Sequence, residues 1–210
     1  MNWTAFIENS LYLLALLNPA SKVMFLATYE PSLSTKQIRE LAWKSSVAAL
    51  LILIVLAGAG EIVLSKVFRV DLYSLKITGG MVLFMIGWLA VREGRFVNQK
   101  EHPDHSSASL VKDVDFTDLS LVPLAAPLIA GPGTIAASIS GTAEHGWGFM
   151  ACSLTAAITV NFVIMLFSGN INRFLTKLHL QGPLIRLTGL IIAAVAVQMV
   201  IAGIRECSLF

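Results

Sequence analysis

Long uncharged segments constrain this chain more than any other feature of its sequence. From Gly146 to Asn172 no residue is charged. A helix rises about 1.5 Å per residue, so about 20 apolar residues cross the hydrocarbon core of a bilayer. Charged residues make up 13% of the chain, whereas a soluble domain has about 25%. The sequence therefore predicts an integral membrane protein, with the lipid bilayer as a partner.

Six segments are apolar enough to cross the bilayer. They cover approximately residues 3–30, 38–64, 72–91, 118–142, 147–171 and 184–205. The stretch 93–117 is polar, contains a proline and lacks periodicity, which is typical of a solvated linker. We therefore predict an all-α membrane protein with six transmembrane helices, a first three-helix repeat in residues 1–92 and a second in residues 118–210.

Two pairs of motifs relate these halves. Residues 75–87 (LKITGGMVLFMIG) align with residues 185–197 (IRLTGLIIAAVAV), an offset of 185 − 75 = 110. Asn18-Pro19-Ala20-Ser21 aligns with Gly131-Pro132-Gly133-Thr134, an offset of 131 − 18 = 113. Because each repeat has an odd number of spans, the second repeat must enter the membrane from the opposite side. The sequence thus predicts a 3+3 inverted repeat.

The distribution of basic residues predicts the orientation. The loops between spans 1 and 2, 3 and 4, and 5 and 6, with the adjoining span ends, carry ten Lys and Arg residues, and the opposite side carries four. Basic residues concentrate on the cytoplasmic side of membrane proteins. Both termini are therefore predicted to face outward, and the linker 93–117 to be cytoplasmic. The net charge of +2 gives no indication of a nucleic-acid partner.

Prolines are predicted to break the first and fourth spans near their middle. A proline lacks an N–H group and clashes with the carbonyl four residues earlier. Inside a bilayer, irregular backbone is tolerated only against protein or a water-filled cavity. Paired broken helices in two inverted halves are typical of a transporter's substrate site, although prolines and glycines can also merely kink a helix. We predict that the substrate-binding residues are Asn18, Pro19, Ala20, Ser21, Lys22, Ala130, Gly131, Pro132, Gly133 and Thr134.

The ends of the broken helices carry opposite partial charges. The helix N-termini near Ser21 and Thr134 are expected to present N–H groups to an anion. The helix ends before the breaks are expected to present carbonyl groups to a cation. The glycines at positions 131 and 133 are expected to let the backbone turn sharply and to let a ligand approach it closely.

Three segments resemble the MarC family of bacterial inner-membrane proteins: LLNPASKVMFLA, LVPLAAPLIAGPGTIAASIS and IRLTGLIIAAVAVQMVIAGI. The resemblance covers nearly the whole chain. It implies six spans, a location in the bacterial inner membrane and kinship with the LysE-type exporter superfamily. Members of the SnatA type are implicated in transport of small neutral amino acids. Many members carry Asp-Pro and then Gly-Asn where this chain has Asn18-Pro19 and Ser21-Lys22, so substrate and coupling can differ.

Other polar residues have both a functional and a structural interpretation. Lys22 either binds a substrate carboxylate or carries a coupling proton, or it extends toward the cytoplasmic surface. Asn161 either lines the cavity or bonds a neighbouring helix. Lys76 is expected to extend toward a membrane interface, and His145, beside Glu144, to lie in a hydrated loop.

Three glycines and a histidine cluster also have a structural interpretation. Gly79, Gly80 and Gly189 suit close packing of helices. In the linker, His102, Asp104 and His105 resemble metal ligands only superficially, so no metal site is expected.

These features favour a secondary transporter. No GxxxxGK[ST] phosphate loop is present, so ATP is not expected to drive it and no cofactor is expected. An intramembrane enzyme would need a nucleophile and base or metal ligands at membrane depth, and the sequence offers neither. A purely structural protein would not need two symmetric breaks. The expected substrates are small neutral amino acids such as glycine, alanine and serine, with efflux of other small metabolites or drugs as the alternative. Coupling to H⁺ or Na⁺ and the oligomeric state stay open.

Overall fold

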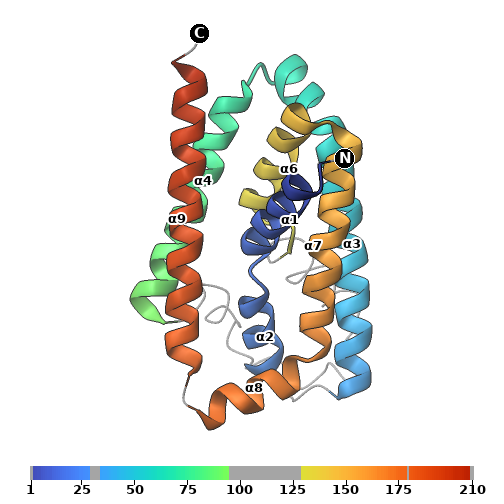
Figure 1. Cartoon of the computed structure of the whole chain (residues 1–210), viewed down its shortest axis with the longest axis vertical. Coiled ribbons are helices and arrows are strands. Elements are labelled where there is room, and N and C mark those ends of the chain that lie inside the picture. Colours follow the sequence, from blue (N-terminus) through green and yellow to red (C-terminus); the bar gives the residue numbers. More distant parts are fainter. Residues whose placement is uncertain (1, 29–33, 95–128, 179, 209–210) are drawn as a thin grey trace, which may run out of the picture.

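The computed structural model describes residues 2–28, 34–94, 129–178 and 180–208, and within these ranges every regular element is helical. The linker of residues 93–117 from position 95 onward lies outside these ranges. So do Pro123, Pro127 and the beginning of the fourth predicted span. The described helices are α1 (Trp3–Leu17), α2 (Pro19–Thr28), α3 (Thr35–Ile62), α4 (Leu72–Glu93), α6 (Pro132–His145), α7 (Trp147–Leu166), α8 (Ser168–Lys177) and α9 (Gln181–Cys207), with a π-helical turn (Val63–Val67) after α3 (Figure 1).

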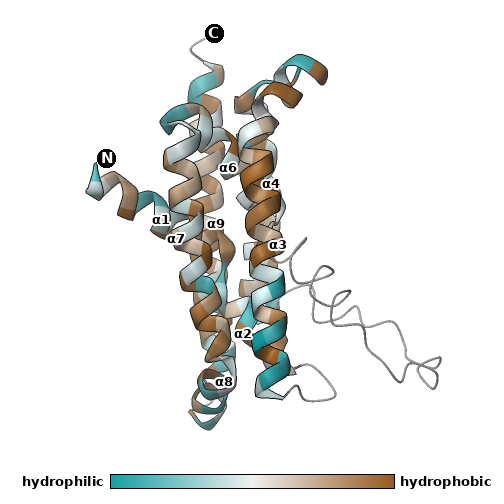
Figure 2. Cartoon of the chain, turned by 90° about the vertical axis from the view of Figure 1, so that its right-hand side faces the viewer, coloured by the Kyte–Doolittle hydropathy of each residue, from teal (hydrophilic) through white to brown (hydrophobic). Residues whose placement is uncertain are grey.

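Four of these helices, α3, α4, α7 and α9, are long and apolar enough to cross a membrane. They correspond to the second, third, fifth and sixth predicted spans. Apolar residues cover much of their length, whereas hydrophilic residues gather at the N-terminal end of α3, on α8 and near the C-terminus (Figure 2). The first predicted span is divided into α1 and α2. The beginning of α1 and the end of α9 lie toward one end of the bundle, and α8 lies at the other (Figure 1).

Local sequence signals set several helix boundaries. Ser34 and Gln37 form a reciprocal capping box at the start of α3, with the Gln37 N–H donating to Ser34 Oγ at 3.3 Å. Such caps satisfy N–H groups that have no partner inside the helix. Gly94 ends α4 at φ 66°, and Gly146 separates α6 from α7 at φ 85°. Glycine adopts these left-handed conformations without steric cost.

Helices α4 and α9 form the most extensive interface between described helices, and glycines line it. A Cβ atom added at Gly80 would lie 2.8 Å from the Ala196 carbonyl, and one at Gly87 would lie 2.7 Å from the Gly189 carbonyl. Positions rise along α4 as they fall along α9, so the helices are antiparallel. Gly79 packs against α6 in the same way. The packing role predicted for Gly79, Gly80 and Gly189 is therefore confirmed.

Helix α8 was not predicted from the sequence. The fifth predicted span ends as α7 at Leu166, and α8 runs across the end of the bundle and packs on α2 (Figure 1). Leu175 is buried while Arg173 and Lys177 are exposed. One apolar side and one charged side are typical of a helix that lies along an interface instead of crossing the membrane.

Helices α1 and α7 contact each other through the first half of α1 and the first turn of α7. The rings of Phe6 and Phe149 lie 6.3 Å apart, and the Asn9 amide nitrogen lies 3.8 Å from the Met150 sulfur. These contacts hold the N-terminal half of the first span against the beginning of α7.

Candidate functional site

The first break lies between α1 and α2. Helix α1 ends at Leu17, Asn18 adopts a left-handed conformation (φ 49°, ψ 73°), and α2 begins at Pro19. The Asn18 N–H donates to the carbonyls of Leu14 at 3.1 Å and Ala15 at 3.2 Å, which closes the end of α1. Asparagine is enriched among the non-glycine residues that adopt this conformation. The predicted interruption before Pro19 is confirmed, and an asparagine makes the turn.

The second break lies at the start of α6. Gly131 is extended (φ −74°, ψ 167°) and Pro132 is the first residue of the helix. Proline fits there because a first-turn N–H has no partner inside the helix. Gly131 has an ordinary negative φ. The expectation that a glycine conformation is needed for the turn is therefore wrong at this position.

Each break contains a side-chain hydrogen bond of the same kind. The Ser21 hydroxyl donates to the Asn18 carbonyl at 2.8 Å, and the Thr134 hydroxyl lies 2.8 Å from the Gly131 carbonyl. Each hydroxyl lies two residues after the proline, and each carbonyl belongs to the residue before it. The Thr134 hydroxyl also lies 3.0 Å from the Ile129 carbonyl. The breaks that the sequence aligned thus share this hydroxyl-to-carbonyl bond, whereas their backbone conformations differ: Asn18 is left-handed and Gly131 is extended.

Lys22 turns back toward the first break. Its side chain is 1% exposed, and its ammonium group donates to the Leu17 carbonyl and, at 3.4 Å, to the Asn18 carbonyl. The alternative in which Lys22 extends to the cytoplasmic surface is therefore wrong. The last carbonyls of a helix carry partial negative charge. The carbonyls expected to face a cation at the end of α1 are already bound by a cation of the chain itself.

The ten predicted binding residues differ in exposure. At Gly133, close packing against a neighbouring helix explains why a glycine is present. A Cβ atom added there would lie 2.2 Å from Leu83 Cδ1 of α4. Leu83, near the midpoint of α4, fills the space that the sequence analysis assigned to a ligand. This contact places the second break near half the depth of α4. Asn18, Ser21, Lys22, Ala130, Gly133 and Thr134 are buried, Pro19, Ala20 and Gly131 are partly buried, and Pro132 is exposed.

Asn161 of α7 is fully buried. Its amide nitrogen lies 3.4 Å from the Met165 sulfur, and its Oδ1 atom has no hydrogen-bond partner among the described residues. Helix α7 packs on α2, the helix that follows the first break, and Asn161 therefore places a free acceptor in a helix that contacts this half of the broken span.

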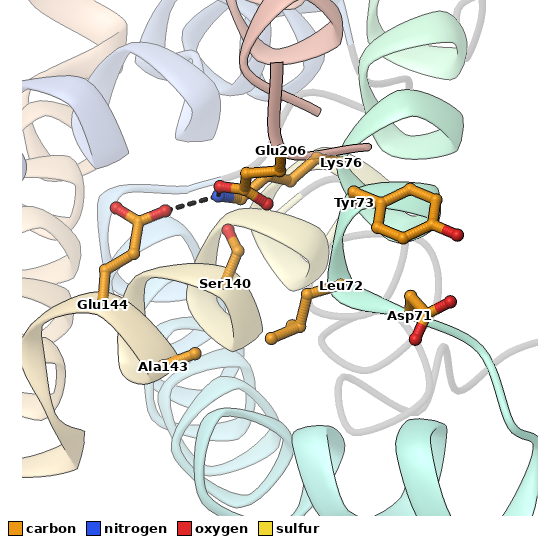
Figure 3. Close-up of a pocket in the computed structure, with 8 residues that line it drawn as sticks. All are labelled: Asp71, Leu72, Tyr73, Lys76, Ser140, Ala143, Glu144 and Glu206. Atoms are coloured by element: carbon orange, nitrogen blue, oxygen red, sulfur yellow. Dashed lines mark hydrogen bonds and ion pairs between the residues drawn. The ribbon is translucent and has the colours of Figure 1, made fainter. Parts of the chain in front are cut away.

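A charged cluster at one end of the bundle was missed. Lys76 of α4 is 6% exposed, and its ammonium group donates to the carboxylates of Glu144 and Glu206 (Figure 3). Lys76 thus lies at the end of the bundle, where an interface was expected, but it is buried against these carboxylates instead of extending into solvent. His145 lies in the last turn of α6, not in a loop, and stacks on Phe149 with 5.2 Å between ring centroids.

A sequence signal for this cluster was available. Charges near a span are favourable only when they are paired. The predicted topology had already placed Lys76, Glu144 and Glu206 on the same side of the membrane, at the ends of different spans. The sequence therefore indicated that Lys76 needs a carboxylate on its own side of the membrane, but not which carboxylates reach it.

Comparisons with known proteins agree with this architecture. The MarC family, described as integral membrane proteins, matches residues 3–208. The inner membrane protein MarC of Salmonella arizonae is 33% identical over 92% of this chain and 91% of its own length. YvbG, a membrane protein of Bacillus subtilis, is 31% identical over 92% and 90%, and the membrane protein PH0214 of Pyrococcus horikoshii is 30% identical over 94% and 92%.

No solved structure matches the chain significantly. The family match covers nearly all of the sequence, and the relatives correspond to it over nearly their full length. The chain belongs to the MarC family of integral membrane proteins.

Proposed function

We propose that this chain is a secondary transporter of small neutral amino acids such as glycine, alanine and serine, which bind between the two broken helices. The observation that carries the proposal is the matched pair of breaks, in which Ser21 and Thr134 make the same hydroxyl-to-carbonyl bond. Helix breaks in two corresponding places are a recurring basis of substrate sites in transporters. The protein is proposed to be a carrier and not an enzyme.

The proposal includes six membrane crossings arranged as a 3+3 inverted repeat, with both termini outside the cytoplasm. Support comes from α4 and α9, which carry the aligned Thr-Gly motifs and pack antiparallel. Helices related by an inversion in the membrane plane would have this relation. Both chain ends lie toward one end of the bundle, as an even number of crossings requires (Figure 1).

The buried polar groups near the breaks suit a zwitterion. The Lys22 ammonium group can exchange its hydrogen bond to the Leu17 carbonyl for one to the carboxylate of a substrate. The free Oδ1 atom of Asn161, in the helix that packs on α2, can accept a hydrogen bond from the substrate's ammonium group. Leu83 fills the space beside Gly133, which leaves little room for a long side chain. The site would therefore select small amino acids.

Coupling follows from the position of Lys22. Its ammonium group occupies the carbonyls that would otherwise coordinate a metal cation at the end of α1. We therefore expect transport without a requirement for Na⁺. The coupling mechanism to be tested is proton-coupled transport in which Lys22 carries the proton.

The test is uptake by proteoliposomes that contain the purified protein. Labelled glycine, alanine, serine and threonine are supplied with a proton gradient, a Na⁺ gradient or neither. The expected result is uptake above that of empty liposomes, lost in Lys22→Met and retained in Lys44→Met. Lys44 is a suitable control because it is solvent-accessible and, among the described residues, pairs with Glu40 of its own helix at 2.9 Å. Absence of uptake for all four amino acids, with uptake of another metabolite or a drug from a wider panel, would refute the proposed substrate.

A further inference from the structure

The cluster formed by Lys76, Glu144 and Glu206 lines an open cavity. The cavity has a volume of about 560 Å³ and is also lined by Asp71, Tyr73 and Ser140 (Figure 3). A second cavity of about 250 Å³ shares Lys76, Ser140 and Glu144 with the first and adds side chains from α1, α6 and α9: Asn9, Tyr12, His145 and Gln198. Charged groups from three helices, α4, α6 and α9, therefore meet beside accessible space.

The exposures within the cluster are unequal. The Lys76 side chain is 8% exposed, whereas that of Glu144 is 50% exposed and that of Glu206 is 38% exposed. The lysine is held inside, and both carboxylates reach the cavity. A ligand entering the cavity can therefore contact the carboxylates without displacing the lysine.

The charges of the cluster are incompletely balanced. Two carboxylates share one ammonium group, so the ionised trio carries a net charge of −1. A carboxylate accepts about four hydrogen bonds, and an ammonium group donates about three. Lys76 uses one donor for each glutamate, so one donor is left, and each glutamate keeps free lone pairs.

A ligand that carries one ammonium and one carboxylate group matches these free positions. Its carboxylate can accept the remaining Lys76 donor, and its ammonium group can donate to Glu206. Such a ligand leaves the net charge of the cluster unchanged. A simple anion would instead be repelled by three carboxylates around the cavity, those of Asp71, Glu144 and Glu206.

We infer that the cavity formed by α4, α6 and α9 is a second binding site, specific for zwitterionic α-amino acids, in which Lys76 binds the carboxylate and Glu206 the ammonium group. Helix α6 connects it to the second break, because Glu144 follows Thr134 by ten residues, about 15 Å along the helix. The inference rests on the proposed function only for the substrate class. It makes the cavity the place where a substrate binds before or after it reaches the broken helices.

The test separates the two sites by using the Lys22→Met protein, in which the site at the breaks is disabled. Binding of L-alanine to the purified protein in nanodiscs is measured by titration calorimetry. We expect L-alanine to bind, and alanine amide and N-acetylalanine, which each lack one charge, to bind about tenfold more weakly or worse, as expected when one charge-assisted hydrogen bond is lost. Equal affinity for alanine amide would show a simple cation site and would overturn the inference.

Variants identify the groups that bind. Adding Glu206→Gln to Lys22→Met keeps the side-chain shape and the bond between Lys76 and Glu144, and should weaken L-alanine binding about tenfold or more. Glu40→Gln is the matched control, because Glu40 pairs with a lysine on the surface of α3, and binding should be unchanged. Since Glu206→Gln could impair folding, Glu144→Gln is measured as well and should also weaken binding. Unchanged binding in both glutamate variants would overturn the inference.

The outcomes distinguish this inference from the proposed function. If the parent protein takes up alanine but Lys22→Met binds none, the inference fails and the proposed transport stands. If Lys22→Met binds alanine through Glu206 but the parent moves no amino acid across the membrane, the proposed transport fails and the binding site stands.

Discussion

Replacing Lys22 with alanine should create a binding site for Na⁺. In the parent protein the Lys22 ammonium group donates to the carbonyls of Leu17 and Asn18 at the end of α1. The Asn18 carbonyl keeps the Ser21 N–H at 3.1 Å and the Ser21 hydroxyl at 2.8 Å. The Leu17 carbonyl loses its lysine partner. Alanine leaves a buried space beside oxygens with partial negative charge, which is the environment of a cation site at a helix C-terminus.

The size of the effect can be worked out from these contacts. Truncating a large buried side chain to alanine costs about 2–5 kcal/mol. Sodium that binds only to the folded state raises the free energy of unfolding by about 2.7 kcal/mol at a concentration of 100 Kd. For a chain of this length that corresponds to a rise in Tm of about 5–10 °C. Lys22→Met fills the same space without charge, so it should bind no Na⁺. Its stability should lie within about 2 kcal/mol of the parent, because the lost hydrogen bonds and the relieved burial of a charge offset each other.

The assay is thermal unfolding of the parent, Lys22→Ala and Lys22→Met in nanodiscs, in sodium chloride and in choline chloride at equal ionic strength. Only Lys22→Ala should melt at a higher temperature in sodium. Uptake by Lys22→Ala, if any remains, should also depend on Na⁺. Identical melting of Lys22→Ala in both salts would show that Lys22 does not occupy a cation position.

Three further predictions concern the glycines that line the interface between α4 and α9 (the glycine seam), the two helix breaks and the orientation of the chain in the membrane. Gly87→Ala should destabilise the protein by about 1–3 kcal/mol, because its Cβ would meet the backbone of α9; Gly148→Ala, with open space around it, should instead stabilise α7 by about 0.5–1 kcal/mol in the same unfolding assay. Ser21→Ala and Thr134→Val should each cost about 1 kcal/mol for the lost hydroxyl bond, and both should weaken alanine uptake; a loss in only one variant would argue against equivalent breaks. A reporter that fluoresces only in the cytoplasm should be dark when fused to the C-terminus and bright when inserted in residues 93–117, and the reverse pattern would refute the proposed orientation.

Proline and glycine positions were the most informative part of the sequence. Pro19 and Pro132 locate the helix starts because the constraint is local: a proline has no N–H to donate and fits only in the first turn. Gly80 and Gly189 indicated close packing for a similar reason, since only a missing side chain lets two backbones approach. These features depend on the residue itself and little on its distant neighbours.

The direction of charged side chains was not predictable in the same way. In the predicted first span, Lys22 lies about two helical turns from the cytoplasmic surface, so its side chain could reach that surface. Whether it turns inward depends on the carbonyl groups that the break leaves without partners. Lys76 depends on Glu144 and Glu206, which are 68 and 130 residues away along the chain. The sequence contained both carboxylates, but only tertiary structure brings them to one lysine. Helix α8 was missed because its apolar side extends the apolar run of α7.

The glycine seam between α4 and α9 has a consequence for motion. Each of these helices belongs to a different predicted repeat, and their backbones touch at Gly87 and Gly189 without intervening side chains. Backbones that fit together this closely cannot slide or tilt without first separating, so the pair should move as one rigid unit. Opening of the substrate site to either side of the membrane would then be confined to the broken helices and to the part of α7 that packs on them. The α4–α9 pair, with one helix from each predicted repeat, would stay fixed, and the broken helices would move relative to it.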